Sequence, residues 1–240
     1  MKMKYVLDTH THTVVSGHAY NTINEMMQAA ADRGLELLGI TEHAMAMPGA
    51  CHEFYFQNGR RVPRERYGVK LLFGAEVNIM DFDGRVDMSD SLMQKMDIVI
   101  ASMHMPCMKK GSRDQNTQAY IEVMKNPWVN IIGHPDDSRF PIDYEALVQA
   151  AREYGKLLEI NNHSMEPGAS RQGARENYLE MLSWCIRYEV PVVVGSDAHV
   201  DIEVGTHENA YKLLTETSFP EKLVANTGVD FLKKYVNCYK

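Results

Sequence analysis

The chain alternates short apolar segments with helical segments, and this alternation limits its fold more than any other feature. Seven apolar segments predict strands, over residues 5–7, 35–40, 69–73, 98–101, 129–132, 156–160 and 191–194. Capped or amphipathic segments between them predict helices, over about 22–34, 89–95, 115–125, 143–154 and 173–188. Strands that alternate with helices pair in parallel through right-handed crossovers. Seven such units favour an α/β fold with a closed or nearly closed barrel.

An open doubly wound sheet is the alternative architecture. Its usual sequence mark, a glycine-rich turn directly after the first strand, is absent from this chain. No linker rich in proline, glycine and serine and no run of like charges marks a boundary within the 240 residues. We therefore expect residues 1–240 to form a single domain.

Composition narrows the class of protein further. Hydrophobic residues make up 45% of the chain and charged residues 24%, which is ordinary for a soluble globular protein. The net charge of −7 argues against an extended nucleic-acid-binding surface. The four cysteines are scattered along the chain, and the first strand begins too early to leave room for a signal peptide, so we expect a cytoplasmic protein. No apolar stretch approaches about 20 residues, so we expect no membrane-spanning segment. The sequence leaves open whether the chain forms a homo-oligomer.

Metal-binding residue types follow the predicted strands. Seven of the ten histidines lie at or just beyond a strand end, namely His10, His12, His43, His104, His134, His163 and His199. Glu76 and Asp197 occupy equivalent places. In a parallel barrel the carboxyl ends of all strands meet at the face that carries the active site, so these side chains should converge. Imidazole and carboxylate suit zinc, and also manganese or iron, and so many ligands indicate two or three ions rather than one.

The order of these motifs resembles the polymerase and histidinol phosphatase (PHP) family, most closely its YcdX-like phosphatase branch. The chain has His-x-His after the first strand, an acid-His pair after the second, Gly-x-Glu after the third, single histidines after the fourth and fifth, and Asp-x-His after the seventh. The similarity covers nearly the whole chain and includes the Leu-Glu-Ile-Asn-Asn run at 158–162. It implies a distorted (β/α)7 TIM-like barrel that holds three metal ions, usually zinc.

The resemblance also implies a set of ligands. One ion would be held by His10, His12, Glu76 and Asp197, a second by Glu76, His104 and His134, and a third by His18, His43 and His199. Glu76 would bridge the first two ions. This chain has Glu42-His43 where many relatives have Asp-His. Neither Glu42 nor Asp8 is expected to be a ligand, and each would instead contact a ligand or its neighbour.

Such a centre predicts a hydrolytic mechanism. Closely spaced ions lower the pKa of a shared water and supply hydroxide, which would attack a phosphorus atom in line. We expect Glu76 to act as the shared carboxylate. Asp197 or His199 would help to protonate the leaving group through water. No serine, cysteine or aspartate nucleophile is then required.

Further residues are candidates for substrate contacts. Arg171 and Arg175 lie where the chain leaves the sixth strand and enters a helix, and they would bind phosphate there, with solvated surface arginines as the alternative. His163 ends the sixth strand, and we place it near the substrate pocket. Four arginines at 60–66 lie on a long loop that would either close over the site or be solvated.

The predicted function is a metal-dependent phosphoesterase whose partner is a small phosphomonoester. A phosphodiesterase or exonuclease using the same centre is the first alternative, and the acidic net charge disfavours it. A non-catalytic metal-binding domain is the second, and the presence of all nine ligands disfavours it. A metal-dependent amidohydrolase barrel is the third, but no lysine stands at an equivalent strand end.

Overall fold

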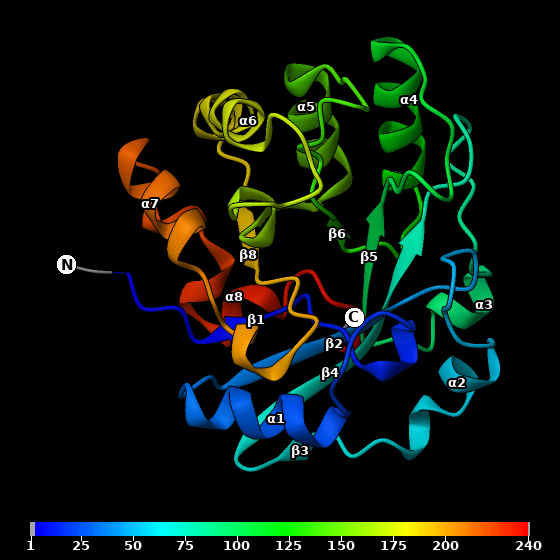
Figure 1. Cartoon of the computed structure of the whole chain (residues 1–240). Coiled ribbons are helices and arrows are strands. Elements are labelled where there is room, and N and C mark those ends of the chain that lie inside the picture. Colours follow the sequence, from blue (N-terminus) through cyan, green and yellow to red (C-terminus); the bar gives the residue numbers. More distant parts are fainter. Residues whose placement is uncertain (1–2, 240) are drawn as a thin grey trace.

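Seven parallel strands follow one another around a nearly closed barrel. The computed structural model describes residues 3–239. The parallel strands are β1 (Leu7–Asp8), β2 (Leu37–His43), β4 (Val69–Asn78), β5 (Ile98–Ser102), β6 (Ile131–Ile132), β7 (Leu157–Asn161) and β8 (Val192–Gly195). Their order in the sheet is their order in the chain (Figure 1). The predicted α/β barrel is therefore confirmed, and the alternative of an open doubly wound sheet is wrong.

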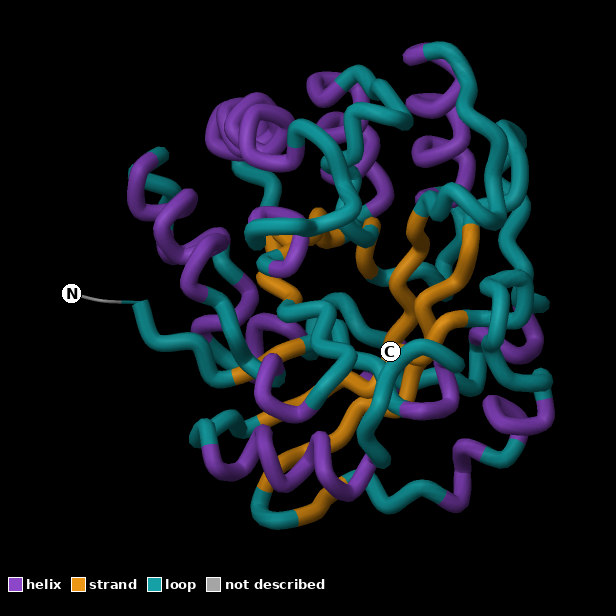
Figure 2. The backbone as a smooth tube through the Cα atoms, viewed as in Figure 1, coloured by secondary structure: helices purple, strands orange, loops and turns teal. Residues whose placement is uncertain are grey.

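Helices surround the strands, as Figure 2 shows. The longer ones are α1 (Ile23–Asp32), α4 (Arg113–Met124), α5 (Tyr144–Tyr154), α6 (Ala174–Tyr188) and α7 (Glu208–Glu216), and the short ones are α2 (Phe54–Gln57), α3 (Asp90–Met93) and α8 (Val229–Leu232). Thr22 and Glu25 form the capping box that the sequence predicts at the start of α1. The helix α4 begins two residues before the predicted 115, because Ser112 and Gln115 form a second capping box there.

One short strand lies outside the predicted pattern. The strand β3 (Glu65–Arg66) falls within the long arginine-containing loop and pairs antiparallel with β4. Antiparallel neighbours need only a tight turn, and Tyr67 and Gly68 supply it with φ angles of 53° and 77°. Part of the arginine loop is thus fixed to the edge of the sheet. No helix among the described residues is long and apolar enough to cross a bilayer.

The barrel interior is apolar at one end only. Leu7, Leu37, Leu72, Ile98, Ile100, Ile131, Leu157 and Val193 fill this part, and Ala225, Leu232 and Val236 from around α8 pack against them. A second apolar cluster lies between the strands and the surrounding helices. Because the apolar interior occupies the amino-terminal part of the strands, the carboxyl ends are left for polar side chains.

The first and last parallel strands, β1 and β8, are joined by a few individual hydrogen bonds instead of a continuous strand ladder. At the carboxyl ends of the strands, Asp197 N donates to His10 O and His12 N donates to Ala198 O, both at 2.9 Å. Further down, the buried Asn226 side chain lies between the two strands. Its Nδ2 donates to Leu7 O at 3.0 Å and to Val194 O at 2.8 Å, and its Oδ1 accepts from Val194 N at 2.7 Å. One amide side chain therefore replaces part of a strand ladder.

Replacing Asn226 with Ala should destabilise the protein strongly. The substitution leaves buried backbone groups of β1 and β8 without partners, so we expect the free energy of unfolding to fall by about 3 kcal/mol. Urea unfolding of both proteins measures the difference. Gln118→Ala, which removes an exposed amide from α4, is the control and should change stability by less than about 0.5 kcal/mol. Equal stability of Asn226→Ala and the wild type would contradict this role in closure.

Candidate metal centre

The strand ends bring the predicted ligands together around Glu76, which lies near the end of β4 and is fully buried. Its Oε1 is 2.8 Å from His134 Nε2, 3.3 Å from His104 Nε2 and 3.5 Å from His10 Nε2. Its Oε2 is 2.7 Å from His43 Nδ1 and 3.6 Å from His12 Nε2. Histidines from four other strand ends thus meet at one carboxylate.

Asp197 lies on the other side of the His10–His12 pair. Its Oδ1 is 3.5 Å from His10 Nε2 and 3.3 Å from His12 Nε2. The two imidazole Nε2 atoms are 3.1 Å apart. Asp197 has a φ of 58°, and His134 has a φ of 26°, so both residues adopt the left-handed region that non-glycine residues seldom occupy. The backbone is therefore strained at two strand ends that point side chains into the cluster.

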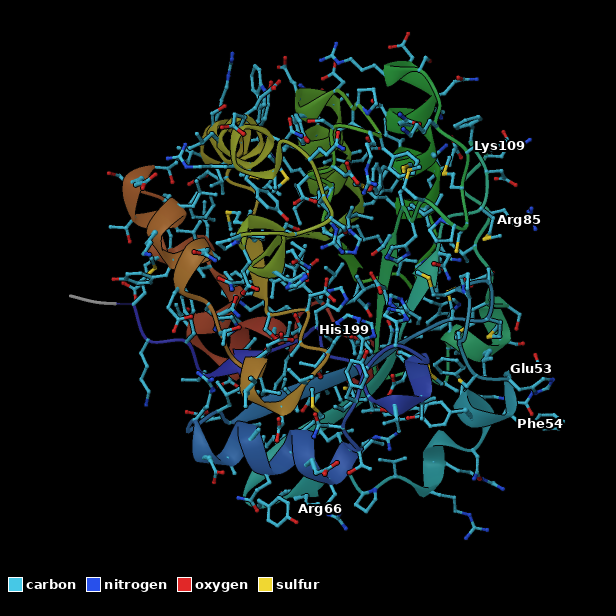
Figure 3. The ribbon with its side chains drawn as sticks, in the orientation of Figure 1. Glu53, Phe54, Arg66, Arg85, Lys109 and His199 are labelled. Carbon is cyan, nitrogen blue, oxygen red and sulfur yellow. The ribbon has the colours of Figure 1, made fainter. Side chains whose placement is uncertain are left out.

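Four imidazole rings stack on one another from the buried His12 to the exposed His18. The ring centroid of His12 lies 4.3 Å from that of His43 and 4.5 Å from that of His199. His18 is exposed and stacks on both, at 4.9 Å from His43 and 5.0 Å from His199. Figure 3 shows His199 near the middle of the view, surrounded by the barrel elements. The three residues predicted for the third ion are thus neighbours at the outer side of the cluster.

The second ring nitrogen of several imidazoles is held away from the cluster. His10 Nδ1 lies 2.7 Å from Glu159 Oε1, His12 Nδ1 3.1 Å from Ser16 Oγ, and His104 Nδ1 2.7 Å from Asn78 Oδ1. His199 Nδ1 lies 2.8 Å from the backbone oxygen of Asp197. Metal-binding histidines characteristically use one nitrogen for the ion and the other for such a partner, which fixes the ring and its tautomer.

Two buried atoms of the cluster have no hydrogen-bond partner among the described residues. His43 Nδ1 and Glu76 Oε2 are buried and lack a hydrogen-bond partner, since their mutual arrangement is not that of a hydrogen bond. Three sets of side chains place their ligand atoms within 4.8 Å of one another, namely His12, His43 and His199; His10, His12 and Glu76; and His43, Glu76 and His104. Mixed imidazole and carboxylate donors with free lone pairs fit zinc, manganese or iron.

Burial and neighbouring charges set the protonation of these groups. Burial alone would raise the pKa of Glu76, but His104, His10 and His43 outweigh it and hold that pKa well below its usual range. Burial lowers the pKa of His12 well below its usual range, and His43 and His199 lower it further. An ionised Glu76 and a neutral His12 are in the states that metal coordination requires. Burial lowers the pKa of His10, but Glu159, Asp197 and Glu76 outweigh it and hold that pKa well above its usual range, so His10 has to lose a proton when it binds an ion.

Several contributing residues are missed by the sequence analysis. Glu159 is fully buried within β7, where its Oε1 faces His10 and its Oε2 accepts from His134 N at 2.8 Å. The sequence signal for Glu159 was a single acidic residue inside an otherwise apolar predicted strand. A Cβ at Gly195 would collide with Glu159 Oε1, so the glycine makes room for this contact. Asn78 is missed as well, because an amide at a strand end carries no specific signal.

Glu42 and Asp8 contact the surroundings of the predicted ligands. Glu42 accepts hydrogen bonds from the hydroxyls of Thr13 and Ser16, and Ser16 Oγ in turn accepts from His43 N at 3.0 Å. Asp8 Oδ1 accepts from Ser196 N at 3.1 Å, and its Oδ2 accepts from Gly205 N at 2.9 Å. These two carboxylates therefore hold the loops from which the ligands project.

The predicted substrate residues separate into two groups. Arg171 reaches the cluster, with its Nη2 donating to Asp197 Oδ2 at 3.1 Å and its Nη1 to Ser164 Oγ at 3.1 Å. Arg175 instead pairs with Glu216 of α7 at 2.5 Å, where both side chains are 53% exposed. His163 Nδ1 pairs with Glu166 at 3.1 Å and is 42% exposed. Only Arg171 of the three contacts a predicted ligand.

The arginine loop lies apart from the cluster. Arg64 pairs with Asp97 at 2.5 Å and also donates to the backbone oxygens of Gly59 and Val62, so it stabilises the loop itself. Arg66 contacts the Asn24 side chain on α1. Figure 3 shows Arg66 at the outer edge of the molecule, far from His199. These contacts hold Arg64 and Arg66 away from the cluster and disfavour the lid interpretation for these two residues.

Glu159→Gln should weaken metal binding without unfolding the protein. The amide lacks the charge that polarises the His10 ring, so we expect the affinity for zinc to fall by about 10–100-fold. Competition with a chromogenic chelator measures this affinity. Glu153→Gln, an exposed position on α5, is the control and should bind zinc like the wild type. Unchanged zinc affinity in Glu159→Gln would rule out its role in orienting His10.

Comparison with known proteins places this cluster in a family. The PHP domain family matches residues 8–170. A probable phosphatase of Acetivibrio thermocellus is 44% identical over 234 residues, which cover 98% of this chain and 96% of that protein. A probable phosphatase of Thermoanaerobacter sp. (strain X514) is 46% identical over 235 residues, covering 98% and 95%.

A solved structure has the same fold. The histidinol phosphate phosphatase of Lactococcus lactis subsp. lactis, determined with zinc, L-histidinol and phosphate, superposes with a TM-score of 0.60 at 18% identity. The superposition covers 89% of this chain and 94% of that one. The two relatives, which match 98% of the chain, are both named probable phosphatases, and this enzyme class agrees with the cluster described above. The chain therefore belongs to the PHP domain family.

Proposed function

We propose that the protein is a zinc-dependent phosphomonoesterase with three metal ions at the ends of its barrel strands. The observation that carries this proposal is the set of imidazole nitrogens facing Glu76 while their second nitrogens are held by Glu159, Ser16 and Asn78. The Lactococcus structure, which contains zinc and phosphate, supports the choice of metal and substrate. Manganese or iron would suit the same donors.

The chain assigns distinct roles to its carboxylates. The two oxygens of Glu76 face different imidazoles, which suits a carboxylate shared between ions. Asp197 directs Oδ1 toward His10 and His12, while its Oδ2 accepts from Arg171 and from Asn161 Nδ2 at 3.0 Å. Bound zinc would supply Lewis acidity and hydroxide near neutral pH. Glu76 and Asp197 would keep the donor set in place throughout the reaction.

Two further residues complete the proposed site. The guanidinium of Arg171 lies beside Asp197 with its side chain 14% exposed, so it can bind a phosphate oxygen at the edge of the cluster. The His199 side chain is 24% exposed and lies next to Asp197. One nitrogen of His199 contacts Asp197 O and the other would bind the third ion, so we assign to Asp197 and His199 the orientation of a water that passes its proton to the leaving alcohol.

A diesterase or exonuclease remains the second candidate, because the same donor set could hold ions for either reaction. Turnover of an aryl phosphomonoester against the matching diester separates the two. Protein purified without chelator should hydrolyse the monoester faster, and a chelator-treated sample should hydrolyse neither ester. Faster diester hydrolysis would replace this proposal by the diesterase. Activity that survives the chelator would contradict metal dependence.

Glu76→Gln tests the shared carboxylate. The amide offers one oxygen donor instead of two and no charge, so we expect monoester hydrolysis to fall by at least about 100-fold, together with the bound metal. Metal analysis and steady-state kinetics measure both effects. Glu65→Gln on β3 is exposed and serves as the matched control, with full activity and metal content expected. Wild-type rate and metal content in Glu76→Gln would disprove the bridging assignment.

A further inference from the structure

A cavity of about 740 Å³ lies beside the start of β1, between α1 and α7. The segment before β1, the end of α1 and the start of α7 line it, and none of the proposed metal ligands does. Figure 1 shows the segment before β1 running between these two helices, at the left of the view. Sites for small molecules have volumes of roughly 300–1,000 Å³, so this cavity is large enough for one. The proposed function gives it no role.

The rim of the cavity carries positive charge. Lys4, Arg33 and Lys212 line it and are exposed, and we call these three residues the cationic rim. Among the described residues that line the cavity, Glu208 is the only acid. Lys4 and Lys212 form no ion pair with any residue between 3 and 239, and Arg33 Nη2 donates to Ile202 O at 2.6 Å. On a chain with a net charge of −7, this local positive charge favours an anion.

Aromatic rings form the inner wall of the cavity. The Tyr5 ring centroid lies 5.5 Å from that of His207 and 6.1 Å from that of Tyr211, and both pairs meet edge to face. All three residues line the cavity, together with Met3 and Leu35. A wall of rings and apolar side chains suits a planar organic molecule better than a hydrated inorganic ion.

Two polar atoms of this wall are not satisfied by the chain. Tyr5 Oη and His207 Nε2 are buried and have no hydrogen-bond partner among the described residues. His207 is 7% exposed, and its Nε2 lies 3.7 Å from Asp8 Oδ2, which is beyond hydrogen-bond distance. A buried polar atom without a partner lowers stability, so two of them beside one cavity point to a partner from outside the chain.

We propose that the cavity is a second binding site of the protein and that its ligand is a small aromatic anion, a planar ring with a carboxylate, sulfonate or phosphate group. The anionic group lies at the cationic rim, where two ammonium groups and one guanidinium donate to it. The ring packs against Tyr5 and Tyr211 on the inner wall. Neither contact involves a group of the proposed metal centre.

One carboxylate, that of Asp8, lies between this site and the metal centre. Its Oδ2 accepts at 2.9 Å from the backbone nitrogen of Gly205, a residue that lines the cavity. Its Oδ1 accepts from His10 N at 3.3 Å and from Ser196 N at 3.1 Å, at the strand ends that carry the cluster. The two sites are therefore neighbours that share no lining residue, so substitutions can assign a ligand to one or the other.

Binding of cinnamate to protein purified without chelator tests the inference. Calorimetric titration compares it with cinnamamide, which has the same ring and no charge, and with acetate, which has the charge and no ring. We expect one cinnamate per chain, at least about tenfold weaker binding of the amide, and no measurable binding of acetate. Equal affinities of cinnamate and cinnamamide, or no binding of cinnamate up to about 10 mM, would overturn the inference.

Charge reversal at the cationic rim separates the two sites. Lys212→Glu and Arg33→Glu should each weaken cinnamate binding by at least about tenfold, because a carboxylate then faces the anion. Lys95→Glu is the matched control, since Lys95 is exposed and does not line the cavity. Arg171→Met should also bind cinnamate like the wild type. Wild-type affinity in both rim variants would refute the proposal, and loss of affinity in Arg171→Met would then assign cinnamate to the metal centre.

Backbone amide resonances locate the ligand by a measurement that does not depend on activity. In a nitrogen–proton correlation spectrum, cinnamate should shift the resonances of Gly205 and Lys212 and leave that of Gly133, which follows β6, unchanged. The same spectra show whether the rim variants are folded. Shifts confined to Gly133 and its neighbours would contradict the cavity as the binding site. Lys212→Gln replaces Lys212→Glu if charge reversal unfolds the protein.

Discussion

The charge balance around Glu76 is the constraint on which the rest of the structure depends. This carboxylate is fully buried, and its oxygens lie within 3.6 Å of imidazole nitrogens from β1, β2, β5 and β6. A buried carboxylate is tolerated only with compensating partners. The histidines thus stabilise the acid in the folded chain before they serve any ion.

Barrel geometry explains why that arrangement can exist. The apolar layer that includes Leu72, Ile100 and Val193 fills the amino-terminal part of the interior, and α8 packs against it. The carboxyl ends of the strands then extend beyond the layer, and residues such as His10 and Asp197 need no apolar neighbours there. An interior that was apolar throughout would leave no space for the nine proposed ligands. The division of the barrel into two parts is therefore as important as its closure.

Much of this arrangement could be predicted from sequence, because strands and their ends have local signatures. Apolar runs followed by His or acid predicted Glu76, His43 and the other strand-end ligands, whereas His18 was implied only by the family resemblance. Glu159 could not be found in this way, since its role arises from β7 lying only one strand away from β1, beyond β8, in the nearly closed barrel. Asn226 belongs to a segment without strand pattern, and only the gap between β1 and β8 gives it a function.

The two arginines predicted to bind phosphate show another limit of prediction from sequence. The sequence supports Arg171 and Arg175 equally as phosphate-binding residues, because they lie four residues apart at the start of one predicted helix. The left-handed Gly173, with a φ of 69°, turns the chain between them. Arg171 consequently precedes the helix and points to Asp197, whereas Arg175 lies on α6 and faces α7. The turn at Gly173 lies between the two arginines, and the sequence pattern around them does not indicate which one contacts the cluster.

The residues that close the barrel also belong to the proposed metal centre. Asp197 N donates to His10 O across the gap between β1 and β8, while both side chains face the cluster. Asp8 fastens the same gap by accepting from Ser196 N. Asp197 and His10 thus join the two strands through their backbones and face the cluster with their own side chains, whereas Asp8 joins the strands through its side chain. Donor atoms held from both strands of the seam cannot separate without opening the barrel, so the fold itself keeps the ligands preorganised.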